Sequence, residues 1–331
     1  MNYKNSQEIL KLVKDSKKIL LNCHRRPDPD SVSSALAMYS VLEEMGEEVD
    51  IICPDSVPEN LDYMDNFEKI KKVDFMTYNF SNYDLFIVLD SGTWDVISDN
   101  IKMPPPRDIK ILKIDHHDKQ EKFENISIID DHASSASEIL YLMFKDWQII
   151  VSKRTASALL SGIIADSVCF SIPLTSSTTL DAASDLIKLG AEKDLIMDKQ
   201  FNSIEPNLLK FFGEVLQNLQ FDNEYNFVWA AIPHSVFSKY KGLLNFKNAT
   251  ANMFFAKVKN SLLGVLMVEE KREYLGVSFR SARRFDTSLI ASELGGGGHH
   301  DSSATKIEGF DFDQAVDLVL STTRKILKSS K

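Results

Sequence analysis

A histidine and two aspartates stand close together in the run His24 to Asp30. Pro29 disfavours helical backbone for the residue before it, so we expect Asp28 to lie on extended chain. Asp28 and Asp30 are two residues apart, and on extended chain they would point to the same side, just after His24. Carboxylate and imidazole groups in this arrangement favour divalent cations. The alternative, that Asp30 only caps a helix, leaves His24 and Asp28 without a role.

Three further points of the chain carry acidic or histidine side chains. Asp90 comes directly after the apolar run LFIVL, and Asp166 follows the apolar run SGIIA. Taken alone, Asp90 is typical of a turn and Asp166 of a helix end. The third point is the end of the run IKILKID, where Asp115 is followed by His116 and His117. Two adjacent histidines flanked by carboxylates have no packing reason to close a strand, which indicates a ligand role.

The segments that carry these residues alternate between strand-like and helix-like patterns, which is typical of a parallel α/β sheet. We predict strands at 18–23, 49–53, 85–90, 109–115 and 126–129, and helices at 31–45, 134–144, 153–165 and 177–189. In an open parallel sheet, ligands bind at the carboxyl ends of the strands. We therefore expect the four acid-bearing ends to share one site, suited to Mn²⁺ or a similar cation rather than to structural zinc.

The second half of the chain has a different pattern of predicted strands and helices. Strands are predicted at 227–232, 262–269 and 274–280, and helices at 287–294 and 313–327. The last two strands are separated by the charged turn 270–273, so we expect an antiparallel hairpin. A polar segment at 191–206 has no strong strand pattern and is predicted to connect two domains, 1–190 and 207–331. The fold class that follows is α/β, with helices on both faces of the N-terminal sheet and a smaller α/β second domain.

The composition fits two folded domains. The chain has 331 residues, of which 44% are apolar and 26% charged. Its formal charge of -10 argues against salt-driven coating of long duplex nucleic acid but permits a short anionic ligand. The odd number of scattered cysteines, Cys23, Cys53 and Cys169, predicts reduced core thiols. No apolar run is long enough to span a bilayer and no cleavable leader is visible, so we expect a cytoplasmic protein.

With these motifs in this order, the chain resembles the DHH phosphoesterase family. The family's name matches Asp115, His116 and His117, and its first motif, a histidine followed by an Asn-Pro-Asp-Gly-Asp-like run, is similar to residues 24–30. Asp90 and Asp166 resemble the acids of the second and fourth motifs. Each motif is weak alone, but their order and spacing are highly specific.

The resemblance continues into the second half and covers nearly the whole chain. Phe279 to Ser281 and the run Gly295 to His299 are similar to the signature of the DHH-associated C-terminal domain. The 1–190 segment would then be the DHH catalytic domain with a two-metal site. The 207–331 segment would be the DHH-associated, substrate-binding domain.

The resemblance implies two divalent ions, most simply Mn²⁺, with Mg²⁺ or Co²⁺ as alternatives. One ion would be held by His24, Asp28 and Asp90, and the other by Asp30, Asp90, His116 and Asp166. Asp90 would therefore bridge the pair. His117 would act beside the ions as an acid or charge stabiliser, and Asp115 would orient the two imidazoles.

Within the family, the chain looks most like the small two-domain branch of oligoribonucleases that also dephosphorylate 3'-phosphoadenosine 5'-phosphate (pAp). This implies that a metal-activated water hydrolyses short oligoribonucleotides (nanoRNA), pAp, or both. The expected partners are short single-stranded RNA or DNA fragments or small nucleotides, with no membrane. A homodimer is an analogy from the family alone.

The second domain is expected to bind the substrate. Arg280 ends an apolar strand and can clamp a phosphate, with Ser281 beside it. The next two arginines, Arg283 and Arg284, add charge nearby, although they could equally be solvated surface. Four consecutive glycines leave backbone amides bare, so Gly296, Gly297 and Gly298 would let a phosphate or base approach, and His299 would add a donor. The alternative is a flexible linker. We expect the metals and this run to meet in a cleft between the domains that selects short substrates.

The first motif departs from that branch at two positions. Arg26 stands where asparagine is usual, and Pro29 stands where glycine is usual. Arg26 adds a positive charge near the metals that can bind phosphate, so it joins the predicted substrate-binding residues. His300 and Asp301, after the glycine run, also differ from the more apolar pattern expected there.

Three other functions remain as alternatives. An inorganic pyrophosphatase shares the metal motifs, but the glycine run and Phe279 to Ser281 argue against it, because that relative has a different C-terminal domain. A phosphodiesterase for cyclic or linear dinucleotides is compatible with the motifs. A non-catalytic nucleotide-binding module is disfavoured, since it would have no need for the complete set of ligands.

Overall fold

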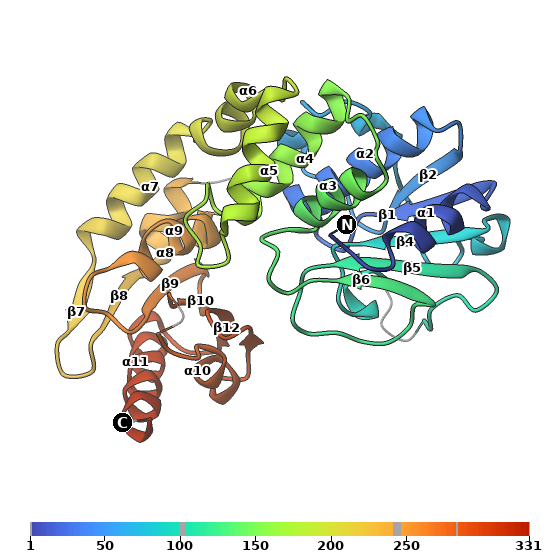
Figure 1. Cartoon of the computed structure of the whole chain (residues 1–331). Helices are drawn as coiled ribbons and strands as arrows, with labels where there is room; N and C mark the ends of the chain where they lie inside the picture. The colour runs from blue at the N-terminus through green and yellow to red at the C-terminus, as the bar shows by residue number, and fades with distance from the viewer. Residues whose placement is uncertain (1, 99–102, 241–245, 283, 331) are drawn as a thin grey trace. The chain divides into compact units, whose positions relative to one another are not determined.

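The computed structural model describes residues 2–98, 103–240, 246–282 and 284–330 (Figure 1). Arg283, which the sequence suggested as an extra positive charge, lies outside these ranges. The chain divides into two compact units, Met1–Ser203 and Ile204–Lys331. Each unit has its own sheet and its own hydrophobic core.

The first unit is built on a parallel sheet. Its described residues form six strands in the order β3-β2-β1-β4-β5-β6. These are β1 (Lys18–Asn22), β2 (Glu48–Cys53), β3 (Ile70–Lys72), β4 (Leu85–Leu89), β5 (Lys110–Asp115) and β6 (Ile126–Ile129). The chain adds strands outward on one side of β1 and then returns to pair β4 with β1. The strand order therefore reverses between β1 and β4, which is where open α/β sheets bind ligands.

The α-helices of this unit contribute to the core on one face of the sheet. They are α1 (Ser6–Lys14), α2 (Pro29–Glu44), α3 (Ala136–Asp146), α4 (Lys153–Asp166), α5 (Ser177–Lys188) and α6 (Lys193–Met197). Alternate strand residues, such as Leu20 and Phe86, face the other side. That side is covered by aromatic residues and the short 3-10 helices η3 (Phe80–Asn82) and η4 (Trp94–Val96). The connection between β3 and β4 contains a 3-10 helix, η3, and no α-helix among its described residues.

Helix α2 explains how the first acidic motif is placed. Asp28 is its N-cap residue, on extended backbone with φ -95° and ψ 179°, and its carboxylate accepts a hydrogen bond from Ser31 N at 3.0 Å. Pro29 occupies the first helical position, where its missing N–H costs nothing. Asp30 therefore lies in the first turn of the helix. The prediction that Asp28 and Asp30 point to one side of an extended chain was wrong for Asp30, because Pro29 itself begins the helix.

The second unit contains a mixed sheet. Its described residues form six strands in the order β11-β12-β10-β9-β8-β7. These are β7 (Gln220–Asp222), β8 (Phe227–Ile232), β9 (Gly264–Lys271), β10 (Tyr274–Arg280), β11 (Gly297–Gly298) and β12 (Ser302–Glu308). The predicted antiparallel hairpin between β9 and β10 is confirmed, and β8 pairs with β9 in parallel.

Helices lie on both faces of this second sheet. Residues of α10 (Ser288–Glu293) and α11 (Phe312–Ser329) share one core cluster with β10, whereas α7 (Pro206–Gln217) and α9 (Phe246–Phe254) share the other with β8. A single-turn helix, α8 (His234–Phe237), follows β8. The predicted α/β class, with a parallel N-terminal sheet and a smaller α/β second part, is confirmed. Helices were expected on both faces of the N-terminal sheet, but among the described residues its α-helices contribute to the core on one face and only short 3-10 helices to the other.

The cysteines are reduced, but they are not all in the core. Cys23 and Cys53 are buried, as predicted, whereas Cys169 is exposed. Cys169 lies beyond the end of α4 in a turn with positive φ at Val168, Cys169 and Phe170, which turns its side chain out of the core. Among the described residues, no helix combines the length and apolar character needed to cross a membrane.

Candidate metal centre

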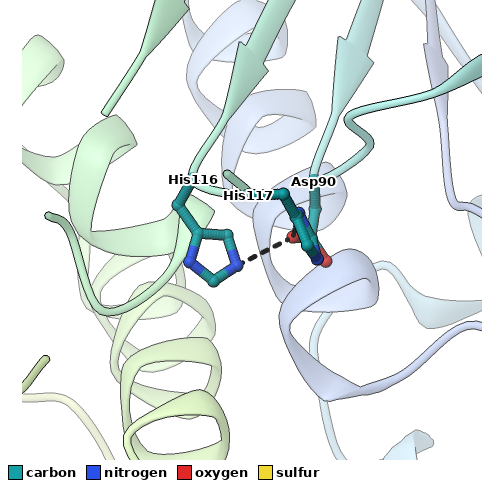
Figure 2. Close-up of side chains that lie close together, drawn as sticks. All are labelled: Asp90, His116 and His117. Atoms are coloured by element: carbon teal, nitrogen blue, oxygen red, sulfur yellow. Dashed lines mark ion pairs between the residues drawn. The ribbon is translucent and has the colours of Figure 1, made fainter. Parts of the chain in front are cut away.

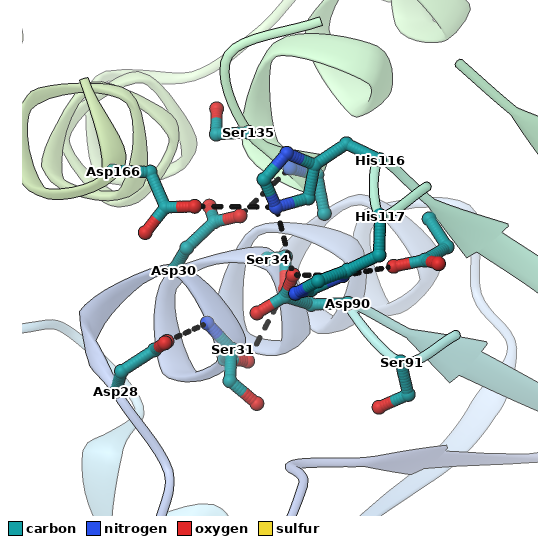
Figure 3. A network of polar contacts seen from close by, with 12 residues as sticks. Asp28, Asp30, Ser31, Ser34, Asp90, Ser91, His116, His117, Ser135 and Asp166 are labelled. Carbon is teal, nitrogen blue, oxygen red and sulfur yellow. Dashed lines mark hydrogen bonds and ion pairs between the residues drawn. The ribbon is translucent and has the colours of Figure 1, made fainter. Parts of the chain in front are cut away.

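Side chains from five separate segments converge at the carboxyl edge of the first sheet (Figure 3). His24 follows β1, Asp90 follows β4, and His116 follows β5. Asp30 comes from the first turn of α2, and Asp166 is the last residue of α4. The predicted metal ligands, His24, Asp28, Asp30, Asp90, His116 and Asp166, are thus brought together by the fold.

Asp90 lies between two imidazole rings. Its Oδ2 atom is 3.4 Å from His24 Nε2. Its Oδ1 atom is 3.3 Å from His116 Nε2 (Figure 2). The side chain is only 2% exposed. Asp28 lies 3.7 Å from His24 Nε2, and Asp166 lies 3.2 Å from His116 Nε2. One carboxylate therefore links a group on the β1 side to a group on the β5 side.

The ligand atoms fall into compact groups. His24, Asp28 and Asp90 form one group, and Asp30, His116 and Asp166 form another, each with ligand atoms within 4.8 Å of one another. Asp90, His116 and His117 form a third group that shares members with the other two. Two adjoining groups that meet at Asp90 are what a pair of bound cations requires.

The chemistry of the centre fits divalent cations. Asp90 Oδ1 and both ring nitrogens of His116 are buried and make no hydrogen bond within the described part of the chain. Burial, with the nearby Asp90 charge, raises the pKa of Asp30 well above its usual value, and burial also raises the pKa of Asp166 to about 6. Buried carboxylates that are short of positive charge, with nitrogen and oxygen donors only, suit Mn²⁺ or Mg²⁺.

The imidazoles of the centre attract protons strongly when no cation is bound. Burial opposes protonation of both rings, but the neighbouring carboxylates outweigh it. Asp28 and Asp90 raise the pKa of His24 well above its usual value. Asp166 and Asp90 raise the pKa of His116 to about 12. A cation would replace these protons, because a metal binds the deprotonated form of the ligand.

Hydrogen bonds orient two of the imidazole rings. His24 Nδ1 lies 2.8 Å from the Arg25 carbonyl oxygen, so Nδ1 carries the proton and Nε2 faces Asp28 and Asp90. His117 Nδ1 lies 2.8 Å from Asp115 Oδ1, and this carboxylate raises the pKa of His117 although burial lowers it. Asp115 was expected to orient both imidazoles, and its contact with His117 agrees with this. No contact of Asp115 with His116 is among the hydrogen bonds of the described residues.

Gln120 is a further residue of the centre that the sequence did not reveal. Its Nε2 atom donates to Asp115 Oδ2 at 2.5 Å and to the His117 carbonyl oxygen at 2.7 Å. It therefore holds the carboxylate that orients His117. A glutamine shortly after the Asp115–His117 run was the available signal, but its side chain has no distinguishing neighbours in the sequence.

The left-handed backbone of Arg26 explains one departure from the expected motif. Arg26 has φ 51°, a conformation that non-glycine residues seldom adopt and that asparagine tolerates better than arginine. Its N–H donates to Asp55 Oδ2 at 2.8 Å, which holds the turn in place. The Arg26 side chain is exposed. The segment beside the metal-ligand groups can therefore present a free positive charge to an anion.

Two family models match the chain. The model for the DHH family, N-terminal domain, matches residues 18–163, and the model for the DHHA1 domain matches residues 248–329. The chain belongs to the DHH family. With its His and Asp clusters, it is a hydrolase of the DHH phosphoesterase type.

Two relatives are similar to this DHH protein along almost their whole length. A Bacillus subtilis protein is 26% identical over 92% of this chain and 94% of its own length. A Thermus thermophilus protein is 24% identical over 97% of this chain and 93% of its own length. Both are named bifunctional oligoribonuclease and PAP phosphatase NrnA. An exopolyphosphatase-related protein from Bacteroides fragilis shares the fold, with a TM-score of 0.86, 23% identity, and coverage of 98% of this chain and 96% of that one.

Apart from Arg26, the predicted substrate-binding residues of the DHH protein lie in its second unit. Arg280 ends β10, where its Nε donates to Asn252 Oδ1 at 2.5 Å and its Nη1 to the Phe279 carbonyl oxygen at 2.8 Å. Burial lowers the pKa of Arg280 from its usual value. Ser281 is only 5% exposed. Its hydroxyl is engaged inside the protein, because it donates to the Leu262 carbonyl oxygen. It also accepts from Arg284 N, so Ser281 shapes the turn.

The glycine run of the DHH protein is an ordered strand and turn. Gly297 and Gly298 form β11 and pair with β12, so their amides are less bare than we predicted. A side chain on Gly296 would place Cβ 2.2 Å from the Ala304 carbonyl oxygen, and one on Gly298 would place it 2.5 Å from Ser303 Cα. The glycines therefore permit close packing against β12. The exposed His299 follows, with its N–H donating to the Ser302 carbonyl oxygen at 2.8 Å.

Proposed function

We propose that this DHH protein hydrolyses short oligoribonucleotides and pAp with two Mn²⁺ ions. The observation that carries the proposal is the convergence of carboxylates and imidazoles on both sides of Asp90. Similarity to two NrnA proteins over nearly the whole chain supports the substrate class.

One ion would be held by His24, Asp28 and Asp90. The other would be held by Asp30, Asp90, His116 and Asp166. When bound, two such ions lower the pKa of a water molecule, orient the scissile phosphate and neutralise charge on the leaving oxygen. Asp90 offers one oxygen to each side, which supports its assignment as the ligand that the two ions would share.

His117 is the proton donor of the proposed reaction. Asp115 binds its Nδ1 atom, so the half-exposed ring is held and keeps Nε2 available. The raised pKa of His117 favours the protonated ring, which can donate to a phosphate oxygen or to the leaving oxygen. Gln120 keeps Asp115 in the position that this requires.

Each unit, taken by itself, has positive or donor groups that are proposed to bind phosphate. Arg280 offers a planar guanidinium whose orientation Asn252 fixes, and this suits a phosphate. His299 is an exposed donor after the glycine run, and Arg26 is an exposed cation beside the metal ligands. The acidic surface implied by the net charge of -10 disfavours long nucleic acids, so the substrate is short.

A substrate panel tests the proposal. Mn²⁺-dependent turnover is measured on pAp, di- to pentaribonucleotides, linear and cyclic dinucleotides, pyrophosphate and a long single strand, with Mg²⁺ and Co²⁺ compared. We expect the highest kcat/KM on the short oligoribonucleotides and pAp. Preference for a cyclic dinucleotide or pyrophosphate would reassign the substrate, and cleavage of the long strand as fast as a dinucleotide would contradict the selection for short ones.

A further inference from the structure

The start of helix α3 holds the carboxylate of Asp30. Ala136 N donates to Asp30 Oδ2 at 2.7 Å, and Ser137 N donates to Asp30 Oδ1 at 3.2 Å. The Ser137 hydroxyl donates to the same Oδ1 atom at 2.5 Å. Asp30 is fully buried, so these donors replace water as its hydrogen-bonding partners. They come from a segment far from Asp30 in the sequence.

This helix start is itself firmly anchored. Ser135 is the N-cap residue and accepts from Glu138 N at 3.0 Å. The buried Glu138 carboxylate accepts from the Ser134 hydroxyl at 2.7 Å and from the Thr179 hydroxyl of α5 at 2.9 Å. Glu138 therefore ties α3 to α5. The donors that reach Asp30 are held by a network in which the buried groups satisfy one another.

Helix α4 approaches the Asp30 carboxylate closely because of a glycine. A Cβ atom on Gly162 would lie 2.2 Å from Asp30 Oδ1 and 2.1 Å from Ser137 Oγ. Both atoms belong to short, buried side chains that cannot swing away. Any side chain at this position would therefore push Asp30, Ser137 or α4 itself out of place.

We propose that Ser137 and Gly162 are positioning residues for one of the two metal ions. Together they fix the Asp30 carboxylate beside His116 and Asp166, the group whose ligand atoms lie within 4.8 Å of one another (Figure 3). The other group, His24, Asp28 and Asp90, does not include Asp30. Displacing Asp30 therefore weakens the binding of the ion at this group and not of the ion at the other group. This inference rests on the proposed two-metal function.

Calorimetric titration of metal-free protein with Mn²⁺ tests the inference without substrate. Wild-type protein is expected to bind two ions. In Gly162→Ala, one ion keeps its affinity within about threefold, whereas the other loses about 10- to 100-fold, the usual effect of disturbing an outer-shell partner. Electron paramagnetic resonance at two Mn²⁺ per chain should then show free ion in the variant and coupled ions in the wild type.

Gly213→Ala is the matched control for the glycine substitution. Gly213 lies within α7, and a Cβ atom there would have no neighbour within 4 Å. Both ions should bind this control as they bind wild type. If Gly213→Ala also failed to bind one ion, the positioning role of Gly162 would be overturned.

Ser137→Ala is a milder variant, and it tests the positioning of Asp30 if Gly162→Ala does not fold. It removes one donor to Asp30 and adds no atom, and we expect about tenfold weaker binding of one ion. Its control is Ser40→Ala, a buried serine of α2 whose hydroxyl accepts from Asn66. Circular dichroism establishes that each variant is folded.

The outcomes separate the inference from the function on which it rests. If wild-type protein binds fewer than two Mn²⁺ ions, the proposed function fails. If wild type binds two ions and folded Ser137→Ala, with Gly162→Ala where it folds, binds both with unchanged affinity, the inference is overturned while the proposed function stands.

Discussion

The two oxygens of Asp90 face different imidazoles, and this side chain links the two ligand groups. Oδ2 lies 3.4 Å from His24 Nε2, and Oδ1 lies 3.3 Å from His116 Nε2. Asp90 also has a left-handed backbone, with φ 52°, which a non-glycine residue seldom adopts. Strained backbone of this kind clusters at functional sites, where surrounding structure holds it. The Asp90 N–H bond to the Ile114 carbonyl oxygen, at 3.0 Å, provides such a restraint.

Asp90→Asn is expected to be the most damaging single substitution. The amide keeps the shape of the side chain but removes the charge that both ions share. We expect kcat/KM to fall by more than the roughly 10- to 100-fold loss typical of an outer-shell partner, and both Mn²⁺ affinities to fall. Steady-state kinetics and calorimetric titration measure the two effects. Asp62→Asn, at an exposed position, is the control. Retention of both ions by Asp90→Asn would contradict the bridging role.

Arg26→Asn separates phosphate binding from catalysis. Asparagine tolerates the left-handed backbone, with φ 51°, and removes only the exposed charge. We expect KM for pAp to rise by about tenfold, the worth of one charge-assisted hydrogen bond, while kcat stays near its wild-type value. Initial-rate kinetics measure KM and kcat separately. An unchanged KM would show that Arg26 does not contact the substrate.

The sequence pointed to the histidines and aspartates that converge around Asp90 because their types and order are distinctive. The residues that form hydrogen bonds with acidic side chains of this site were not predicted. Gln120 and Ser137 are ordinary polar residues, and their contacts with Asp115 and Asp30 exist only after folding. Asp30 was predicted to lie on extended backbone. It lies in the first turn of α2, because Pro29 is the first residue of that helix.

A buried lysine joins the loops that carry the ligands. Lys113 lies on β5, and its Nζ atom donates to the Glu121 carbonyl oxygen at 2.7 Å and lies 3.2 Å from Glu124 Oε2. Glu121 N in turn donates to the Gly92 carbonyl oxygen at 2.8 Å, in the loop that follows Asp90. These contacts tie together the loops after β4 and β5. Both the lysine and Glu124 are almost completely buried.

Lys113→Met is expected to destabilise the first unit. Removing one partner of a buried ion pair leaves Glu124 poorly compensated, so the free energy of unfolding should fall by about 3 kcal/mol, since Lys122 still pairs with that carboxylate at 2.9 Å. Urea unfolding in a Trp229→Phe background reports this unit alone through Trp94 and Trp147. Lys110→Met, at the exposed start of the same strand, should change stability by less than about 0.5 kcal/mol. Equal effects from the two lysines would contradict this.

Many elements with a clear apolar pattern were predicted within a residue or two, but the amphipathic helices α1 and α7 were not predicted. Strands β6, β8 and β10 match their predicted ranges, because each is bounded by polar or turn residues. Strand β3 was missed because it is short and rich in lysine. Strand β12 was missed because it follows the glycine run, which looked like an unpaired loop rather than its partner strand. The predicted limits of the two domains, 1–190 and 207–331, stay a prediction.

Across the whole molecule, metal binding is expected to stabilise the fold increasingly as pH rises. The pKa of about 12 for His116 and about 6 for Asp166 means that a cation must displace protons from the metal-free centre. Fewer protons compete at higher pH, so the apparent Mn²⁺ affinity rises from pH 5 to pH 8. A ligand at 100 times its Kd stabilises by about 2.7 kcal/mol. Thermal unfolding with and without Mn²⁺ should show a larger increase in Tm at pH 8 than at pH 5. The opposite order would contradict the protonation described for the centre.

Anomalous diffraction from crystals grown with Mn²⁺ tests the two-ion arrangement most directly. Data collected at the manganese edge should show two peaks in each chain, one beside His24 and Asp28 and one beside His116 and Asp166, with the Asp90 carboxylate between them. A single peak, or peaks away from Asp90, would contradict the account.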